Sequence, residues 1–92
     1  MPPISEEERK AHILYKLSRH NRWGGKHTEI VNVRSALPRE DRGSTEKLVR
    51  KLADEGLITW LKKTGKIHIS LNPHRKKEIT EIVGKYLGRK IW

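Results

Sequence analysis

Apolar residues recur three or four positions apart in four segments of the chain, which is the spacing of amphipathic helices. The expected helices are 5–20, 28–37, 44–55 and 73–87. Ser5 and Glu8 have the spacing of a capping box at the start of the first helix. Gly56 and Gly88 follow the third and fourth helices, where a left-handed residue commonly ends a helix. The pattern therefore predicts a mainly helical domain.

The segment from Thr28 to Leu37 fits two structures. A helix would place Ile30, Val33 and Leu37 along one side, with Thr28 as its cap. Pro38 would end that helix, because proline pushes the residue before it out of helical geometry. The β-branched side chains of the segment, Ile30 and Val33 among them, keep a strand possible. We expect the helix.

Apolar and polar residues alternate in the stretch before the last helix, which predicts a β-hairpin. The expected hairpin spans 57–71. Directly opposed residues share a face of a hairpin, so Trp60 should oppose Ile67 or Ile69, and the loop should hold an even number of residues. A two-residue turn would force Thr64, a β-branched residue, to a positive φ. We therefore expect a four-residue loop, 62–65.

This order of elements resembles the winged helix-turn-helix superfamily, in the style of MarR-like and ArsR-like regulators. Residues 28–71 carry the resemblance, and it is densest over 48–58, LVRKLADEGLI, which looks like a recognition helix running into the first strand of a wing. The resemblance implies one domain over 1–92, mainly α with a small β-hairpin, in the order α-α-α-β-β-α. In that family the recognition helix, here 44–55, enters the major groove of duplex DNA, and the wing touches the flanking backbone.

The charge of the chain agrees with a nucleic-acid partner. Lys and Arg total 21 against 11 Asp and Glu, a formal net charge of +10, and such a field attracts polyanions. Duplex DNA is the favoured partner, and a transcriptional regulator is the expected role. Charged residues make up 35% of the chain and Gln and Cys are absent, a composition that leans towards a thermophile.

Catalytic and metal-binding patterns are missing from the sequence. The chain has no Cys, and no two of its five His lie three or four residues apart. Residues 24–28 lack the spacing of a phosphate-binding loop. We expect no enzyme activity, no metal and no cofactor. No stretch is long and apolar enough to span a membrane, and the acidic N-terminus is unlike a signal peptide, so we expect a cytoplasmic protein.

Basic and hydroxyl side chains on the expected recognition helix and wing are the candidate DNA contacts. Lys47 and Arg50 face outward on the helix and are assigned to base edges. Lysines at the wing tip are assigned to the backbone or minor groove of the flanking duplex, and the remaining candidates to phosphate. The candidate DNA-binding residues are Arg34, Arg39, Arg42, Ser44, Thr45, Lys47, Arg50, Lys51, Lys62, Lys63 and Lys66.

Two alternatives stay open beside a DNA-binding regulator. Basic residues outside the recognition helix and wing, such as Arg19, Arg22 and Lys90, would favour an RNA- or ribosome-associated protein. A module for protein–protein interaction is the other alternative. The apolar C-terminus also suggests a homodimer surface. Its expected residues are Tyr86, Leu87, Ile91 and Trp92.

Overall fold

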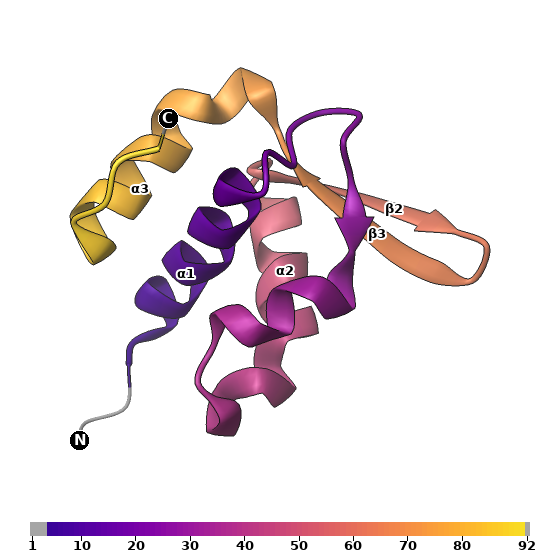
Figure 1. The fold of residues 1–92 in the computed structure, drawn as a ribbon, viewed down its shortest axis with the longest axis horizontal. Helices are drawn as coiled ribbons and strands as arrows, with labels where there is room; N and C mark the ends of the chain where they lie inside the picture. The colour runs from indigo at the N-terminus through magenta and orange to yellow at the C-terminus, as the bar shows by residue number, and fades with distance from the viewer. Residues whose placement is uncertain (1–3, 92) are drawn as a thin grey trace.

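Residues 4–91 are described by the computed structural model, and within them helices and a small antiparallel sheet form the fold (Figure 1). The α-helices are α1 (Glu6–Arg19), α2 (Thr45–Asp54) and α3 (Lys76–Leu87). The strands are β1 (Thr28–Glu29), β2 (Ile58–Lys63) and β3 (Lys66–Leu71), in the sheet order β1-β3-β2. Three 3-10 segments complete the chain: η1 (Ile30–Ala36), η2 (Arg39–Ser44) and η3 (Pro73–Arg75). The predicted mainly helical class is confirmed, and the element order is roughly that of a winged helix.

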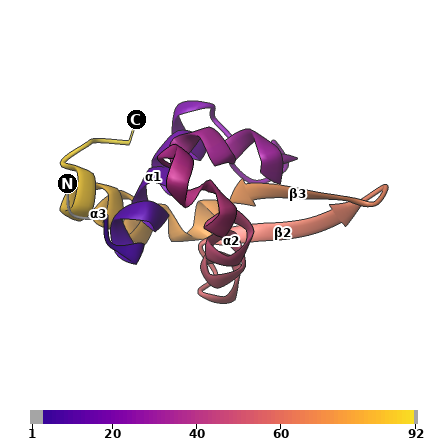
Figure 2. The same ribbon diagram turned by 90° about the horizontal axis from the view of Figure 1, so that it is seen from below.

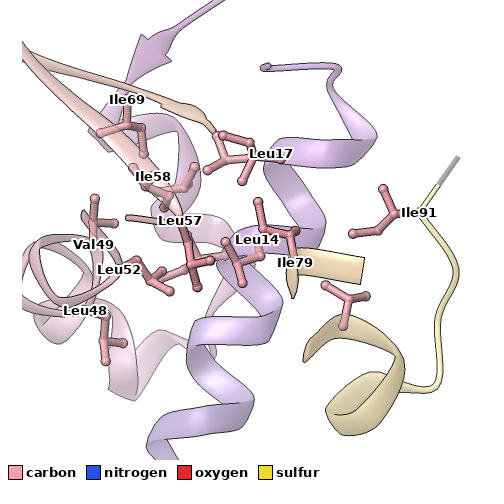
Figure 3. Close-up of a cluster of buried hydrophobic side chains, with 14 of the residues drawn as sticks. Leu14, Leu17, Leu48, Val49, Leu52, Leu57, Ile58, Ile69, Ile79 and Ile91 are labelled. Atoms are coloured by element: carbon pink, nitrogen blue, oxygen red, sulfur yellow. The ribbon is translucent and has the colours of Figure 1, made fainter. Parts of the chain in front are cut away.

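The elements lie in a row. Both views show α3, α1, α2 and the β2–β3 hairpin in that order, with the hairpin projecting away from the helices (Figures 1 and 2). Leucine, isoleucine and valine side chains from α1, α2, α3 and the sheet meet in one core (Figure 3). Leu14 and Leu17 of α1 lie near its centre, 0% and 1% exposed. The helix pattern seen in the sequence therefore points each apolar stripe at this core.

The ends of α1 and α3 follow the sequence signals. Ser5 Oγ accepts a hydrogen bond from the backbone N–H of Glu8 at 3.1 Å, as the capping box predicts. Asn72 Oδ1 accepts one from the N–H of His74 at 3.0 Å, and η3 follows before α3 begins. Gly88 ends α3 with a left-handed φ of 63°.

The prediction of an α-helix over 28–37 is wrong. Thr28 and Glu29 pair with Ile69 and His68 of β3, and the following residues form the 3-10 helix η1. The β-branched side chains crowd an α-helical turn, and the open edge of β3 offers the backbone other partners. Thr28 consequently caps no α-helix. Leu37, with φ −104° and ψ 151°, is extended before Pro38, as predicted.

The start of α2 also differs from the prediction. Helix α2 lies within the predicted 44–55, but the 3-10 helix η2 leads directly into it. The hydroxyls expected to cap α2 turn backwards instead. Ser44 Oγ donates to the carbonyl of Asp41 at 2.7 Å, and Thr45 Oγ1 donates to that of Arg42 at 2.8 Å. The preceding 3-10 turn supplies carbonyl acceptors at that spacing, and it removes the extended backbone that a side-chain cap needs.

The hairpin confirms the predicted facing of Trp60 and corrects the predicted loop. Trp60 pairs with Ile69, and Lys63 pairs with Lys66, so the turn holds only Thr64 and Gly65. Their φ angles are 50° and 77°. A turn with two positive φ angles matches the twist of the strands, and it allows one more strand pair than a four-residue loop. Those gains outweigh the cost of a left-handed threonine, which is on the order of 1 kcal/mol.

A network of charges ties α1 to α2. Lys10, only 8% exposed, places its Nζ 2.8 Å from Glu55 and within 4 Å of Glu7 and Glu6. Lys51 of α2 donates to Glu6 at 2.7 Å. Burial by itself lowers the pKa of Lys10, but the hydrogen bond to Glu55 and the three negative charges outweigh it and raise that pKa.

Acid should weaken this network. The hydrogen bond from Lys51, helped by the charges of Lys51, Lys10 and Arg9, lowers the pKa of Glu6 below its ordinary 4.5. A carboxyl with a lowered folded-state pKa stabilises the fold above its unfolded pKa and loses that effect as the pH falls. We expect the free energy of unfolding, measured by urea denaturation, to decline below pH 4.5, and Glu6→Gln to remove part of that decline.

Glu81→Gln is the matched control, because Glu81 is exposed and has no ion pair within residues 4–91. It should leave the pH profile unchanged. Equal profiles for Glu6→Gln and the unaltered chain would show that the Glu6–Lys51 contact carries no stability.

Candidate nucleic-acid interface

The outward face of α2 carries fewer free cations than its sequence suggests. Lys47 is exposed and takes part in no ion pair within residues 4–91. Arg50 lies 3.8 Å from Glu46, one helical turn away, and Lys51 is held by Glu6 of α1. The helix itself is therefore close to neutral, and Lys47 and Arg50 are its side chains that can best reach a ligand.

Arg50 connects α2 to the hairpin. Its guanidinium carbon lies 4.8 Å from the ring centroid of Trp60 on β2, a cation–π contact. Trp60 stands on the α2 side of the sheet, because β2 packs against α2 and Trp60 shares its face with the buried Ile58 and Ile69. Lys62, two residues further along β2, shares that face. The outer face of α2 and the hairpin face with Trp60 and Lys62 thus form one continuous surface, whereas Lys63 and Lys66 lie on the opposite face of the hairpin.

The hairpin tip gathers positive charge. Lys63 and Lys66 are direct strand partners on either side of the turn, and Lys62 is exposed beside them. Like charges placed directly opposite each other destabilise a hairpin. Glu29 of β1 offsets part of the repulsion, 3.4 Å from Lys66 Nζ. Lys62 and Lys63 have no carboxylate within ion-pair distance in the described chain, so an anion bound here would relieve the repulsion.

Three other predicted DNA-binding side chains already form hydrogen bonds within the protein. Thr45 is 3% exposed, with its hydroxyl bound to the backbone. Ser44 Oγ is likewise bound to a carbonyl, and Arg42 Nε donates to the carbonyl of Leu37 at 3.1 Å. These three side chains are therefore placed to shape the turn before α2. Thr45 and Ser44 are therefore not part of the exposed surface of α2.

Arg34 and Arg39 are exposed near the start of α2. A shallow hollow of about 280 Å³ brings Arg34 and Arg42 together beside Val31, which is 50% exposed. Arg39 does not line this hollow. Arg34 can thus join a phosphate contact at the N-terminal end of α2, whereas Arg39 stands apart.

Sequence reasoning missed the acidic partners of this surface. Glu6 forms an ion pair with Lys51, and Glu29 forms one with Lys66, although the residues of each pair are far apart in sequence. The helical spacing of Glu46 and Arg50 was a signal that could have been found. Within residues 4–91 no group of three His, Asp or Glu side chains could hold a metal. His27 and His68 approach with their Nδ1 atoms 3.3 Å apart, which supplies two ligands at most.

No helix in the described part of the chain is long and apolar enough to cross a membrane. Comparison of the sequence with family models and with curated proteins, and of the structure with solved structures, gave no match. The resemblance to winged helix-turn-helix proteins therefore rests on the residues 28–71 and on the order of the elements.

Proposed function

We propose that this protein binds duplex DNA as a winged helix-turn-helix domain and acts in transcription regulation. In this proposal α2 is the recognition helix in the major groove, and the β2–β3 hairpin is the wing on the flanking backbone. The contact of Arg50 with Trp60 carries the proposal, because it joins the exposed side of α2 to the wing on one surface.

The charges of that surface suggest a division of labour. Lys47 and Arg50 supply the side chains for base edges, and arginine is well shaped for guanine. The lysines of the wing tip supply phosphate contacts, which need charge and little shape. Because Glu46 lies beside Arg50, α2 contributes little net charge, so most of the sequence-independent affinity should come from the wing.

Arg50 must leave one partner to reach a base. The Arg50 and Glu46 side chains are exposed and Trp60 is half-buried, so each contact of Arg50 is worth about 1 kcal/mol. A bidentate pair with guanine is worth about 1–3 kcal/mol of discrimination. The cost of releasing one contact is therefore small beside the discrimination gained, and in this proposal Trp60 keeps Arg50 close to the major groove.

Fluorescence anisotropy with a labelled duplex, a structured RNA hairpin and a single strand tests the proposal. We expect the duplex to bind more tightly than the RNA hairpin, with an affinity that falls steeply as salt rises from about 50 to 200 mM. Replacing Arg50 by Ala should change the preference among duplex sequences, and Asp54→Asn on the same helix is the control. Tighter binding of the RNA hairpin would favour the RNA-associated alternative, and duplex binding indifferent to salt would contradict the proposal.

A further inference from the structure

A second basic region lies at the far end of α1, away from the proposed DNA surface. A groove of about 610 Å³ opens between the C-terminal end of α1, the start of α3 and the C-terminal tail. Arg19, Lys76 and Lys90 line it, together with the rings of Tyr15 and Trp23. Figure 2 shows the tail and α2 on opposite sides of α1, so a ligand in this groove would not meet α2.

The described lining of this groove is basic, with no acidic side chain to offset the charge. Its described residues include three cations and no carboxylate. A neighbouring hollow of about 370 Å³ shares Tyr15 and Arg19 with it and adds Lys16 and Arg89, again with no described carboxylate. None of these cations forms an ion pair within residues 4–91, in contrast to Arg50 and Lys51 on α2. The region is therefore suited to a strongly anionic ligand.

The backbone that carries Trp23 is held in place by the fold. Hydrogen bonds from Leu71 N to the carbonyl of Arg22, at 2.7 Å, and from Gly24 N to the carbonyl of Leu71, at 3.0 Å, fix the backbone on both sides of Trp23. Cations already lie near the rings: Lys76 Nζ is 5.9 Å from the Trp23 centroid, and Arg19 is 5.8 Å from that of Tyr15. Charge and aromatic surface thus lie together in a largely preformed groove.

We propose that this groove binds a single-stranded segment of nucleic acid. The phosphates would lie against Arg19, Lys76 and Lys90, and an unpaired base would stack on the ring of Trp23. A basic groove with aromatic rings in it is the combination by which proteins hold single strands, whereas a duplex keeps its bases stacked inside. The volume of about 610 Å³ is within the range of sites that hold a small ligand, and so is large enough to admit a nucleotide unit.

This site goes beyond the proposed duplex binding, and its location would let it bind a strand while a duplex is bound. With a duplex on α2 and the wing, the groove on the other side of α1 stays open to a second segment. One monomer could then hold a duplex and an unpaired strand together. DNA and RNA strands share the phosphate and base chemistry, so both are probes in the test.

Matched charge removal separates the two sites. Arg19→Gln with Lys90→Gln removes two exposed cations from the groove, and Lys62→Gln with Lys63→Gln removes two from the hairpin tip. With labelled oligothymidylate and oligouridylate as probes, we expect the groove pair to weaken single-strand binding about tenfold or more and the hairpin pair to change it about twofold at most. For a labelled duplex the order should reverse. Equal losses of single-strand binding in both pairs would overturn the groove, whatever the duplex does.

The fluorescence of Trp23 reports base stacking, which electrostatic attraction alone would not change. In a chain with Trp60→Phe and Trp92→Phe, Trp23 is the remaining tryptophan of the original three, and its emission should be quenched when oligothymidylate binds. Trp23→Phe keeps a ring and should retain single-strand binding, whereas Trp23→Leu should weaken it about fivefold or more. Binding of oligothymidylate with unchanged Trp23 emission and an unaffected Trp23→Leu variant would overturn the stacking and the proposal with it.

Discussion

Replacing Lys62 and Lys63 by glutamine is expected to weaken duplex binding about 10- to 100-fold near physiological salt. Both side chains are exposed and have no carboxylate within ion-pair distance in the described chain, so their full charge is available to phosphate. Each lost phosphate contact should also reduce the slope of log affinity against log salt by about 1, so the pair should reduce it by about 2. All duplex sequences should lose affinity alike, because phosphate contacts carry no sequence information.

Lys77→Gln with Lys85→Gln is the control, because it removes the same charge from α3, at the other end of the molecule (Figure 1). Anisotropy titrations of both pairs, at several salt concentrations, give the comparison. The control should cost about threefold at most through the loss of general attraction. Similar losses and similar salt slopes for both pairs would show that the hairpin tip makes no specific contact with the duplex.

Ile91→Ala is expected to lower the free energy of unfolding by about 2–4 kcal/mol. Ile91 is 4% exposed, although it lies near the end of the chain, and it belongs to the same core cluster as Leu14 and Ile79. Figure 3 shows its side chain pointing from the tail towards α1. The loss is a large share of the roughly 5–15 kcal/mol that holds a small domain together. Urea denaturation monitored by circular dichroism measures it.

Val31→Ala is the control for that experiment, because Val31 is 50% exposed and its truncation should cost about 0.5 kcal/mol or less. Because Ile91 is buried in the core of its own chain, it is not available to the expected dimer surface, and the homodimer itself stays a prediction. Tyr86 and Leu87 are partly buried, and Trp92 lies outside the described residues. A loss of stability in Ile91→Ala that depends on protein concentration would support the homodimer.

The helices and the facing of the hairpin were predictable because their signals are local. Three of the four expected helices exist as α-helices within a few residues of the expected bounds, and Trp60 faces the strand partner that parity allowed. The segment 28–37 was not predictable in this way, since Thr28 and Glu29 form a strand only where β3 offers an edge, and the residues after them form a 3-10 helix. The turn at Thr64 shows the same limit, because strand pairing there outweighs a local preference.

The exposure of the main candidate lysines was predictable from the sequence, but their ion pairing was not. Lys47, Lys62 and Lys63 are exposed, as helix and strand periodicity imply. The pairing of Lys51 with Glu6 joins residues 45 positions apart, and no local rule links them. The same holds for the groove at the end of α1, where Arg19, Lys76 and Lys90 come from three separate segments.

The sequence by itself determined which side chains turn inward on each element and how much positive charge the chain carries. Periodicity depends only on neighbouring residues, and net charge only on composition. Only the tertiary structure decided which charges are neutralised, that Ile91 is buried in the core, and that Arg19, Lys76 and Lys90 gather in one groove apart from α2. Those outcomes depend on distances between segments remote in sequence, and the packing of one core sets all of those distances at once.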